Sequence, residues 1–272
     1  MTDADPAARW AGGAFGERGR CVLAPNPNIL TLDGTNTWVL REPGARRSIV
    51  VDPGPEVLVH LDAVAEAAGE VAAVLLTHHH ADHSEAARTV AERMGCGVRA
   101  LDPAYRLGSE GLGDGDVVAV DGLEVHVVGT PGHTADSLSF LLPAERVVLT
   151  GDTVLGRGTT VVAHPDGQLG AYLDSLDRLH ALADAQEATA IWPGHGPVIA
   201  DALAVLDHYR AHRRDRLEQV REAVRALDLT PAQADPRTVV ETVYADVDPV
   251  LWGAAELSVR AQLEFLAGGE RR

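Results

Sequence analysis

Six consecutive positions, from His78 to His83, hold four histidines and one aspartate directly after an apolar run, in the stretch LLTHHHADH. Four of these side chains can converge on one point if the chain turns as it leaves a strand: His78, His80, Asp82 and His83. Imidazole nitrogens and carboxylate oxygens are ligands that suit Zn²⁺. Neighbouring protonated imidazoles would repel each other without a cation between them. The segment is therefore predicted to bind metal, and alternation along the chain directs His79 away from the site.

Three further residues of the same chemical type follow strand-like segments later in the chain, each beside glycine. His133 lies in GTPGHT, Asp152 in LTGDT and His195 in WPGHG. Any one of them alone is more typical of a solvated loop, but three strand ends together with the histidine cluster form a constellation. Glycine lets the backbone approach where a Cβ would clash, so it can re-aim a ligand side chain. The sequence therefore predicts one site assembled from four separate segments.

The elements that must position these residues alternate along the first two hundred residues. Short apolar runs at 37–40, 48–52 and 72–77 are typical of buried strands. Helical spacing predicts helices over 56–69 and 84–95, with Ser84 capping the second and Gly69 and Gly95 ending them. Residues 116–130 form two alternating runs around Asp121-Gly122, which predicts a hairpin. Strands at 137–143, 146–152 and 188–194 and a helix at 169–183 complete a layered α/β pattern.

The last part of the chain is helical throughout. A long pattern covers 201–227, and two shorter ones cover 235–246 and 248–267. We therefore expect two domains, a hydrolase domain over 1–208 and a small helical domain over 209–272. Three helices in such a tail are similar to a winged-helix unit, although little sequence is left for a wing.

The motif HHHADH, with His133, Asp152 and His195 in this order, resembles the metallo-β-lactamase superfamily over roughly residues 21–209. The resemblance implies a four-layer αββα sandwich with a dinuclear metal site at one edge of its sheets. It assigns one metal to His78, His80 and His133, and the other to Asp82, His83 and His195. It also implies that Asp152 bridges the two metals and that Asp52, in VVDPG, orients a ligand histidine from behind.

A narrower resemblance depends on LTLDGTNTWVL, GDTVLGRGTTVV and IWPGHGPVI. These motifs look like the β-lactamase-like protein 2 group, which includes endoribonucleases specific for single-stranded RNA. Fungal polyketide thioesterases of the superfamily share several of them. One departure is HSEA, where many members have small glycines after the histidine motif. Glu85 is therefore expected to reshape the mouth of the pocket.

Such a site predicts hydrolysis with water as the nucleophile. Two divalent cations would hold a bridging hydroxide at neutral pH and stabilise the oxyanion that forms. Asp82 and Asp152 are the predicted catalytic carboxylates, with Asp82 orienting the hydroxide. The ligand set favours two Zn²⁺ per chain, with iron or manganese as alternatives. Candidates for substrate contact lie in the neighbouring motifs: Asn36, Thr159 and His164.

Single-stranded RNA is the predicted substrate, and two other classes remain as alternatives. Single-stranded RNA agrees with the narrower resemblance and with four arginines of the long helix, Arg210, Arg213, Arg214 and Arg216, although these can equally be a solvated helix face. A thioester, ester or lactone of a small acyl group needs the same chemistry. A β-lactam is at most a promiscuous substrate, because the well-known lactamases have cysteine at the place of Asp152. A ligand-sensing regulator with a DNA-binding tail is disfavoured by the complete ligand set.

Composition limits the partners. The net charge of −17 argues against binding to nucleic acid or anionic membranes, and specific DNA binding is not expected. Two cysteines, no signal-like N-terminus and no apolar run of spanning length predict a cytoplasmic protein. The sequence makes no prediction about the oligomeric state. Four histidines outside the motifs are expected to face solvent: His60, His126, His180 and His208.

Overall fold

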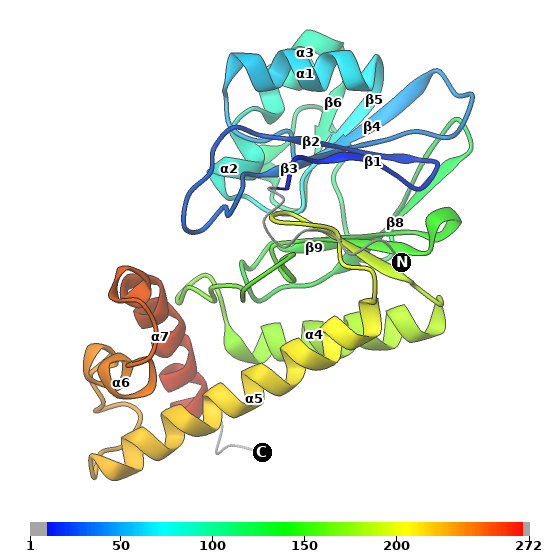
Figure 1. Ribbon diagram of the computed structural model, residues 1–272. Helices are drawn as coiled ribbons and strands as arrows, with labels where there is room; N and C mark the ends of the chain where they lie inside the picture. Colours follow the sequence, from blue (N-terminus) through cyan, green and yellow to red (C-terminus); the bar gives the residue numbers. More distant parts are fainter. Residues whose placement is uncertain (1–9, 269–272) are drawn as a thin grey trace.

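The computed structural model describes residues 10–268, which fold into two sheets packed face to face with helices on both outer surfaces (Figure 1). The first sheet has the order β1-β2-β3-β4-β5-β6 and the second the order β11-β10-β9-β8-β7. The predicted four-layer αββα sandwich is confirmed.

In the first sheet, β1 (Gly13–Phe15), β2 (Gly19–Leu23), β3 (Asn36–Leu40) and β4 (Arg47–Val51) are antiparallel neighbours. The strands β5 (Glu70–Leu75) and β6 (Gly97–Arg99) then continue the sheet in parallel with β4. Two helices, α1 (Leu58–Ala68) and α3 (Ala87–Met94), form the parallel crossovers and cover the outer face. A one-turn helix, α2 (Ala81–Ser84), lies within the histidine motif.

The second sheet contains the predicted hairpin, β7 (Val117–Val120) and β8 (Leu123–Gly129), followed by β9 (Leu138–Leu142) and β10 (Val147–Gly151). Asp121 and Gly122 both have positive φ, at 50° and 97°, as a type I′ turn requires. The last strand, β11 (Ala190–Pro193), is parallel to β10. Helices α4 (Leu169–Ala185) and α5 (Ala202–Ala226) cover the outer face of this sheet.

The two sheets bury one apolar core between their inner faces. Trp38 of β3 and Trp192 of β11 stack across it, with ring centroids 4.7 Å apart and planes 13° apart. Phe140 of β9 is fully buried in the same cluster. Aromatic side chains of this size bury much more surface than aliphatic ones, so a chain with few aromatics concentrates them where the sheets meet.

The predicted helix ends are partly correct. Gly69 and Gly95 end α1 and α3 with positive φ, as expected for glycine caps. The prediction that Ser84 caps a helix is wrong, because its Oγ donates to the carbonyl of His79 and α3 begins only at Ala87. The short helix α2 therefore interrupts what the sequence pattern presents as one helix.

The C-terminal part consists of α5, α6 (Pro236–Val243) and α7 (Trp252–Gly268), which share a small apolar cluster. Short 3₁₀ turns occur at Pro103–Tyr105, Pro143–Glu145 and Pro249–Leu251. Between β11 and residue 268 the structure has no further strand, so the described tail is helical and lacks a wing. The expected boundary at 208/209 lies inside α5, which continues through it unbroken. Within residues 10–268, no helix has the length and apolar character needed to cross a membrane.

Candidate metal centre

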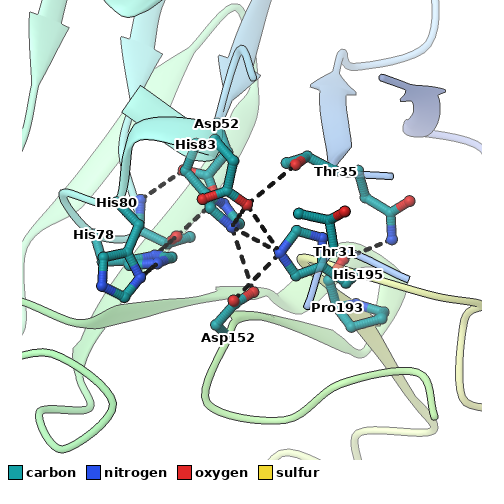
Figure 2. A network of polar contacts seen from close by, with 12 residues as sticks. Thr31, Thr35, Asp52, His78, His80, His83, Asp152, Pro193 and His195 are labelled. Atoms are coloured by element: carbon teal, nitrogen blue, oxygen red, sulfur yellow. Dashed lines mark hydrogen bonds and ion pairs between the residues drawn. The ribbon is translucent and has the colours of Figure 1, made fainter. Parts of the chain in front are cut away.

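The seven predicted ligands converge at one edge of the sandwich. Figure 2 labels five of them: His78, His80, His83, Asp152 and His195. The pairs β4·β5 and β10·β11 are each parallel, so within a pair the carboxyl ends lie at the same edge of the sheet. Residues that follow β5 supply four ligands, and residues that follow β8, β10 and β11 supply one each. The first sheet thus provides the consecutive motif, and the second sheet provides the three scattered residues.

One group of three ring nitrogens comes from both sheets. His80 Nδ1 lies 3.1 Å from His78 Nε2 and 3.0 Å from His133 Nε2. His78 and His133 are buried, whereas His80 is half-buried and marks the side from which solvent reaches the group.

A second group lies beside the first. His195 Nε2 is 3.2 Å from His83 Nε2 and 3.1 Å from Asp82 Oδ2, and the last two atoms are 3.4 Å apart. Both imidazoles are buried, while 30% of the Asp82 side chain is exposed. Asp82 is therefore the part of this group that solvent can reach.

Asp152 lies between the two groups. One of its oxygens, Oδ1, is 3.4 Å from His83 Nε2. The other, Oδ2, is 3.3 Å from His195 Nε2 and 3.8 Å from His133 Nε2. Oδ1 is buried and has no hydrogen-bond partner among the described residues. A buried carboxylate oxygen without a donor is costly, unless a cation compensates for it.

The donor set fits divalent metal. Four tetrahedral ligands at zinc-to-nitrogen distances of about 2.0–2.1 Å would be about 3.3 Å apart, close to the spacings found in both groups. Nitrogens packed this closely repel each other through their lone pairs unless protons or a cation lie between them. The three residues assigned to each metal by the family resemblance form two close groups in the structure, and a third group, Asp52, His78 and His83, overlaps both.

In three of the ligand histidines, Nδ1 makes a hydrogen bond to a carbonyl or carboxylate oxygen. This bond turns the other ring nitrogen, Nε2, toward the centre. His133 Nδ1 donates to the carbonyl of Val161 at 2.8 Å, and His195 Nδ1 donates to the carbonyl of Gly34 at 3.1 Å. His83 Nδ1 donates to Asp52 Oδ2 at 2.9 Å. Each bond fixes the tautomer in which Nε2 carries the lone pair.

Asp52 acts as an acceptor rather than as a ligand. Besides the His83 ring, its carboxylate accepts the Thr77 N–H at 2.8 Å and the Thr77 hydroxyl at 2.6 Å. Because that hydroxyl donates to Asp52, it accepts from His78 Nδ1, 3.0 Å away. Asp52 therefore orients one histidine of each group, and it does so from a left-handed backbone conformation with φ 51°.

The pKa values of the buried groups show where the centre favours positive charge. Burial alone would lower the pKa of His195, but the charge of Asp152 and its hydrogen bond raise it to about 9. Burial also opposes protonation of His83, yet Asp152, Asp82 and Asp52 raise the pKa of that ring well above its usual range. Burial raises the pKa of Asp82, but the nearby histidines outweigh it and lower the value to about 2. Positive charge is therefore strongly favoured around His83 and His195, and metal ions would supply it. In the first group, burial lowers the pKa of all three histidines, so their nitrogens are neutral and free to bind a cation: His78, His80 and His133.

A close backbone approach leaves room for the ligands. A Cβ on Gly194 would lie 2.5 Å from Asp152 Oδ1 and 2.8 Å from His83 Cε1. The glycine of WPGHG is therefore required by the packing of two ligands, which agrees with the role predicted for these glycines.

The residues predicted to contact substrate are placed very differently. Asn36 is fully buried, and its amide donates to the carbonyls of Pro193 and Gly196, so it joins the two sheets. Thr159 is exposed in the loop after β10. His164 is half-buried and lines a cavity of about 550 Å³ between α4 and α7.

Two histidines that were not predicted to bind metal can be compared with their predicted orientation. His79 faces away from the metal ligands and contacts Asp136 Oδ1 at 2.8 Å, in agreement with the predicted alternation. The prediction that His60 faces solvent is wrong: its side chain is buried, and its Nε2 lies 2.9 Å from the Thr37 hydroxyl. That hydroxyl donates to the Asp52 carbonyl, so His60 supports the residue behind the metal site.

Sequence reasoning missed several partners of the ligands. Thr77 is directly before the histidine motif, and this proximity was the available signal. Thr35 contacts Asp82 Oδ2 at 3.3 Å and lies within LTLDGTNTWVL, a motif in which only Asn36 was named as a site residue. The carbonyls of Gly34 and Val161 have no side-chain signature at all.

Comparison with known proteins agrees with this geometry. Residues 30–195 match the family model described as "Metallo-beta-lactamase superfamily". A beta-lactamase-like protein 2 homolog from Caenorhabditis elegans is 34% identical over 83% of this chain and 76% of its own length. An atrochrysone carboxyl ACP thioesterase from Aspergillus chevalieri is also 34% identical, over 82% of this chain and 71% of its own.

A solved structure has the same fold. The metallo-beta-lactamase family protein TTHA1429 from Thermus thermophilus superposes with a TM-score of 0.76 at 22% identity, covering 94% of this chain and 95% of its own. The family match spans more than half of the residues, and the relatives align with most of the chain. The chain therefore belongs to the metallo-beta-lactamase superfamily and is a hydrolase of that superfamily.

Proposed function

We propose that this hydrolase uses two zinc ions to activate water, and that it cleaves the thioester or ester bond of a small substrate with an apolar acyl group. The observation that carries the metal part is the arrangement of seven ligands in two groups of three, with Asp152 between them. Iron is the alternative metal, since TTHA1623, a structural relative with a TM-score of 0.55, is described in a di-iron-bound form.

The chemistry divides between metals and residues. Two zinc ions held here would lower the pKa of water and polarise a carbonyl oxygen. Asp82 is ionised at neutral pH and partly exposed, so its carboxylate can accept a hydrogen bond from a water molecule and aim that water at the substrate. Asp152 is less exposed than Asp82, and its carboxylate lies next to histidines of both groups.

An apolar loop favours an acyl substrate. The loop 24–35, between β2 and β3, is joined to the centre through Thr35 and through the carbonyl of Gly34. Near its tip, the side chains of Ile29 and Leu30 remain 49% and 54% exposed. The Asn28 side chain fixes this tip by accepting the N–H groups of Leu30 and Thr31. A loop that is joined to the metal site and holds aliphatic side chains in water near its tip is suited to bind an apolar group.

The arginines of α5 give RNA little support. Arg210 pairs with Asp177 and Asp207. Arg216 donates to the carbonyl of Val243 and lies over the ring of Tyr244. Arg213 is buried. Arg214 is the most exposed of the four arginines, and its guanidinium lies 3.9 Å from the Asp177 carboxylate. Ion-paired and buried arginines would have to be released before they could neutralise phosphates.

Single-stranded RNA, the first choice from the sequence, becomes the second candidate. It keeps this place because the resemblance to the β-lactamase-like protein 2 group implies it and a homolog of that name is similar over most of the chain. The thioester proposal has the support of the relative named as a thioesterase, which is as similar to this chain. Promiscuous β-lactam hydrolysis is compatible with either.

The test offers one preparation of known zinc content four substrates: acyl thioesters of increasing chain length, a lactone, labelled single-stranded RNA and a chromogenic cephalosporin. His80→Ala, which removes a ligand, is the control for metal-dependent turnover. We expect thioester hydrolysis whose KM falls as the acyl chain lengthens, and which is lost in the control.

Two matched variants sharpen the test. Leu30→Ser should raise KM for the longest acyl chain about tenfold, because it removes apolar contact worth about 1–2 kcal/mol. Val117→Ser changes a similarly exposed residue on the edge strand β7 and should leave KM unchanged. RNA cleavage that disappears in His80→Ala, without thioester turnover, would reject the acyl substrate and establish the second candidate.

A further inference from the structure

The loop that follows β10 contains or contacts two metal ligands but has no regular structure of its own. Residues 152–168 form neither helix nor strand. Asp152 begins this loop, and the carbonyl of Val161, further along it, accepts the His133 ring at 2.8 Å. The position of this loop therefore decides where one ligand lies and how another is oriented.

Side chains from α4 and α5 hold the loop by its backbone. The hydroxyl of Tyr172 donates to the carbonyl of Thr153 at 2.6 Å. The hydroxyl of Tyr209 accepts the N–H of Leu155 at 2.9 Å. One turn further along α5, Nη2 of Arg213 donates to the carbonyl of Thr160. Thr160 is itself buried, and its hydroxyl donates to the carbonyl of Asp152 at 2.7 Å.

Arg213 is unusual among the arginines of this chain. Its side chain is 5% exposed, and no carboxylate of the described residues pairs with it. Its guanidinium lies over the Tyr172 ring, with Cζ 4.8 Å from the centroid, and Nε has no partner within residues 10–268. Burying a cation without an anion beside it costs free energy. The presence of Arg213 at this position therefore needs an explanation beyond packing.

We propose that Arg213 is a positioning residue for the metal centre: by holding the Thr160 carbonyl, it fixes the Thr160–Val161 backbone that orients His133 and anchors Asp152. This inference depends on the proposed two-metal site but not on the substrate. It also gives α5 a second task, because the same helix packs against α6 and α7 further along. The metal centre and the C-terminal helices thus share one rigid element.

The experiment compares full-length Arg213→Met and Arg213→Lys with wild type. Methionine keeps an apolar contact with Tyr172 but cannot donate to Thr160, whereas lysine can still donate. Arg214→Met is the matched control, since it changes the exposed neighbour. The measurements are zinc affinity against a competing chelator and the visible spectrum of the cobalt-substituted protein, which reports ligand geometry directly.

We expect Arg213→Met to weaken the binding of one zinc equivalent by about tenfold, the lower end of what residues behind metal ligands contribute. Its cobalt spectrum should change, Arg213→Lys should recover part of the affinity, and Arg214→Met should match wild type. Wild-type affinity and spectrum in a folded Arg213→Met protein would overturn the inference.

If Arg213→Met does not fold, Thr160→Val carries the test, because it removes the hydroxyl bond to Asp152 and leaves the carbonyl bond to Arg213 in place. Reduced zinc affinity in Thr160→Val would support the role of this backbone, and unchanged affinity would overturn it. Failure of wild type to bind two metal equivalents would instead reject the proposed two-metal site.

Discussion

Asp52→Asn isolates the contribution of one carboxylate that touches no metal in the proposed assignment. Asparagine has nearly the same shape and tolerates the φ of 51° at this position, so the backbone should not move. However, its NH₂ group replaces an acceptor by a donor. Asp52 accepts three hydrogen bonds, two from Thr77 and one from His83. At least one of these donors must then face another donor.

The size of the effect follows from those contacts. Losing one hydrogen bond to a charged group costs about 1.5–3 kcal/mol. Since about 1.4 kcal/mol corresponds to a factor of ten, zinc binding should weaken about 10- to 100-fold. If the His83 ring instead changes tautomer, its Nε2 gains a proton and is lost as a ligand. Because the Thr77 hydroxyl bonds to both Asp52 and His78, the substitution should affect both groups of ligands.

The assay is a zinc titration against a competing chelator, with metal content measured after dialysis. Asp121→Asn is a matched control, because Asp121 has a φ of 50° and is paired with a surface arginine, Arg47. Asp121 precedes β8, whereas the nearest ligand in sequence, His133, follows the other end of that strand. It should bind zinc as wild type does. Two zinc equivalents bound with wild-type affinity by Asp52→Asn would refute the argument that ring orientation behind the ligands sets metal affinity.

Three other predictions concern the centre itself. Asp82→Ala should abolish turnover while the circular dichroism spectrum is unchanged, and wild-type rates would exclude Asp82 from the mechanism. Gly194→Ala should lose zinc, because its Cβ would lie 2.5 Å from Asp152 Oδ1, whereas Gly253→Ala, with open space around it in α7, should bind normally; equal zinc content would contradict the packing argument. In chelator-treated protein, the raised pKa of His195, about 9, stabilises the fold fully only below the unfolded value of about 6.5. Its melting temperature should therefore fall as pH rises from about 6.5 through 9, and a rise over this range would contradict the assigned charges.

The metal ligands could be predicted from the sequence because their signals are local. Four of them lie within six positions, and the other three each follow an apolar strand beside glycine. Their division between two metals came from the family resemblance, and both sets of three are among the close groups of the structure. Short strands such as β1 and β6 escaped prediction, since three residues carry too little periodicity to be recognised.

The surroundings of the site could not be predicted, because tertiary contacts decide them. Asn36 was a candidate for substrate contact, yet its amide is used between the two sheets. His60 has the spacing of a surface residue on an amphipathic helix, but it is buried beside Thr37. The arginines of α5 resemble a solvated basic face, although one of them is buried under the loop after β10. In each case the partner comes from a segment distant in sequence, and the motif that contains it does not show which residue it contacts.

The contrast between local sequence signals and tertiary contacts explains why the chemistry of this protein is easier to infer than its substrate. The two ligand groups draw on both sheets, and three carboxylates, Asp52, Asp82 and Asp152, lie close to the same buried histidine, His83. Such a concentration of negative charge is stable only with cations or protons beside it, so the residues that build the centre also reveal its function. We expect substrate recognition to depend instead on the loops 24–35 and 152–168, whose side chains Leu30 and Thr159 are exposed. A superfamily with one metal centre can therefore hydrolyse many substrates, and the two loops are where specificity in this chain has to be sought.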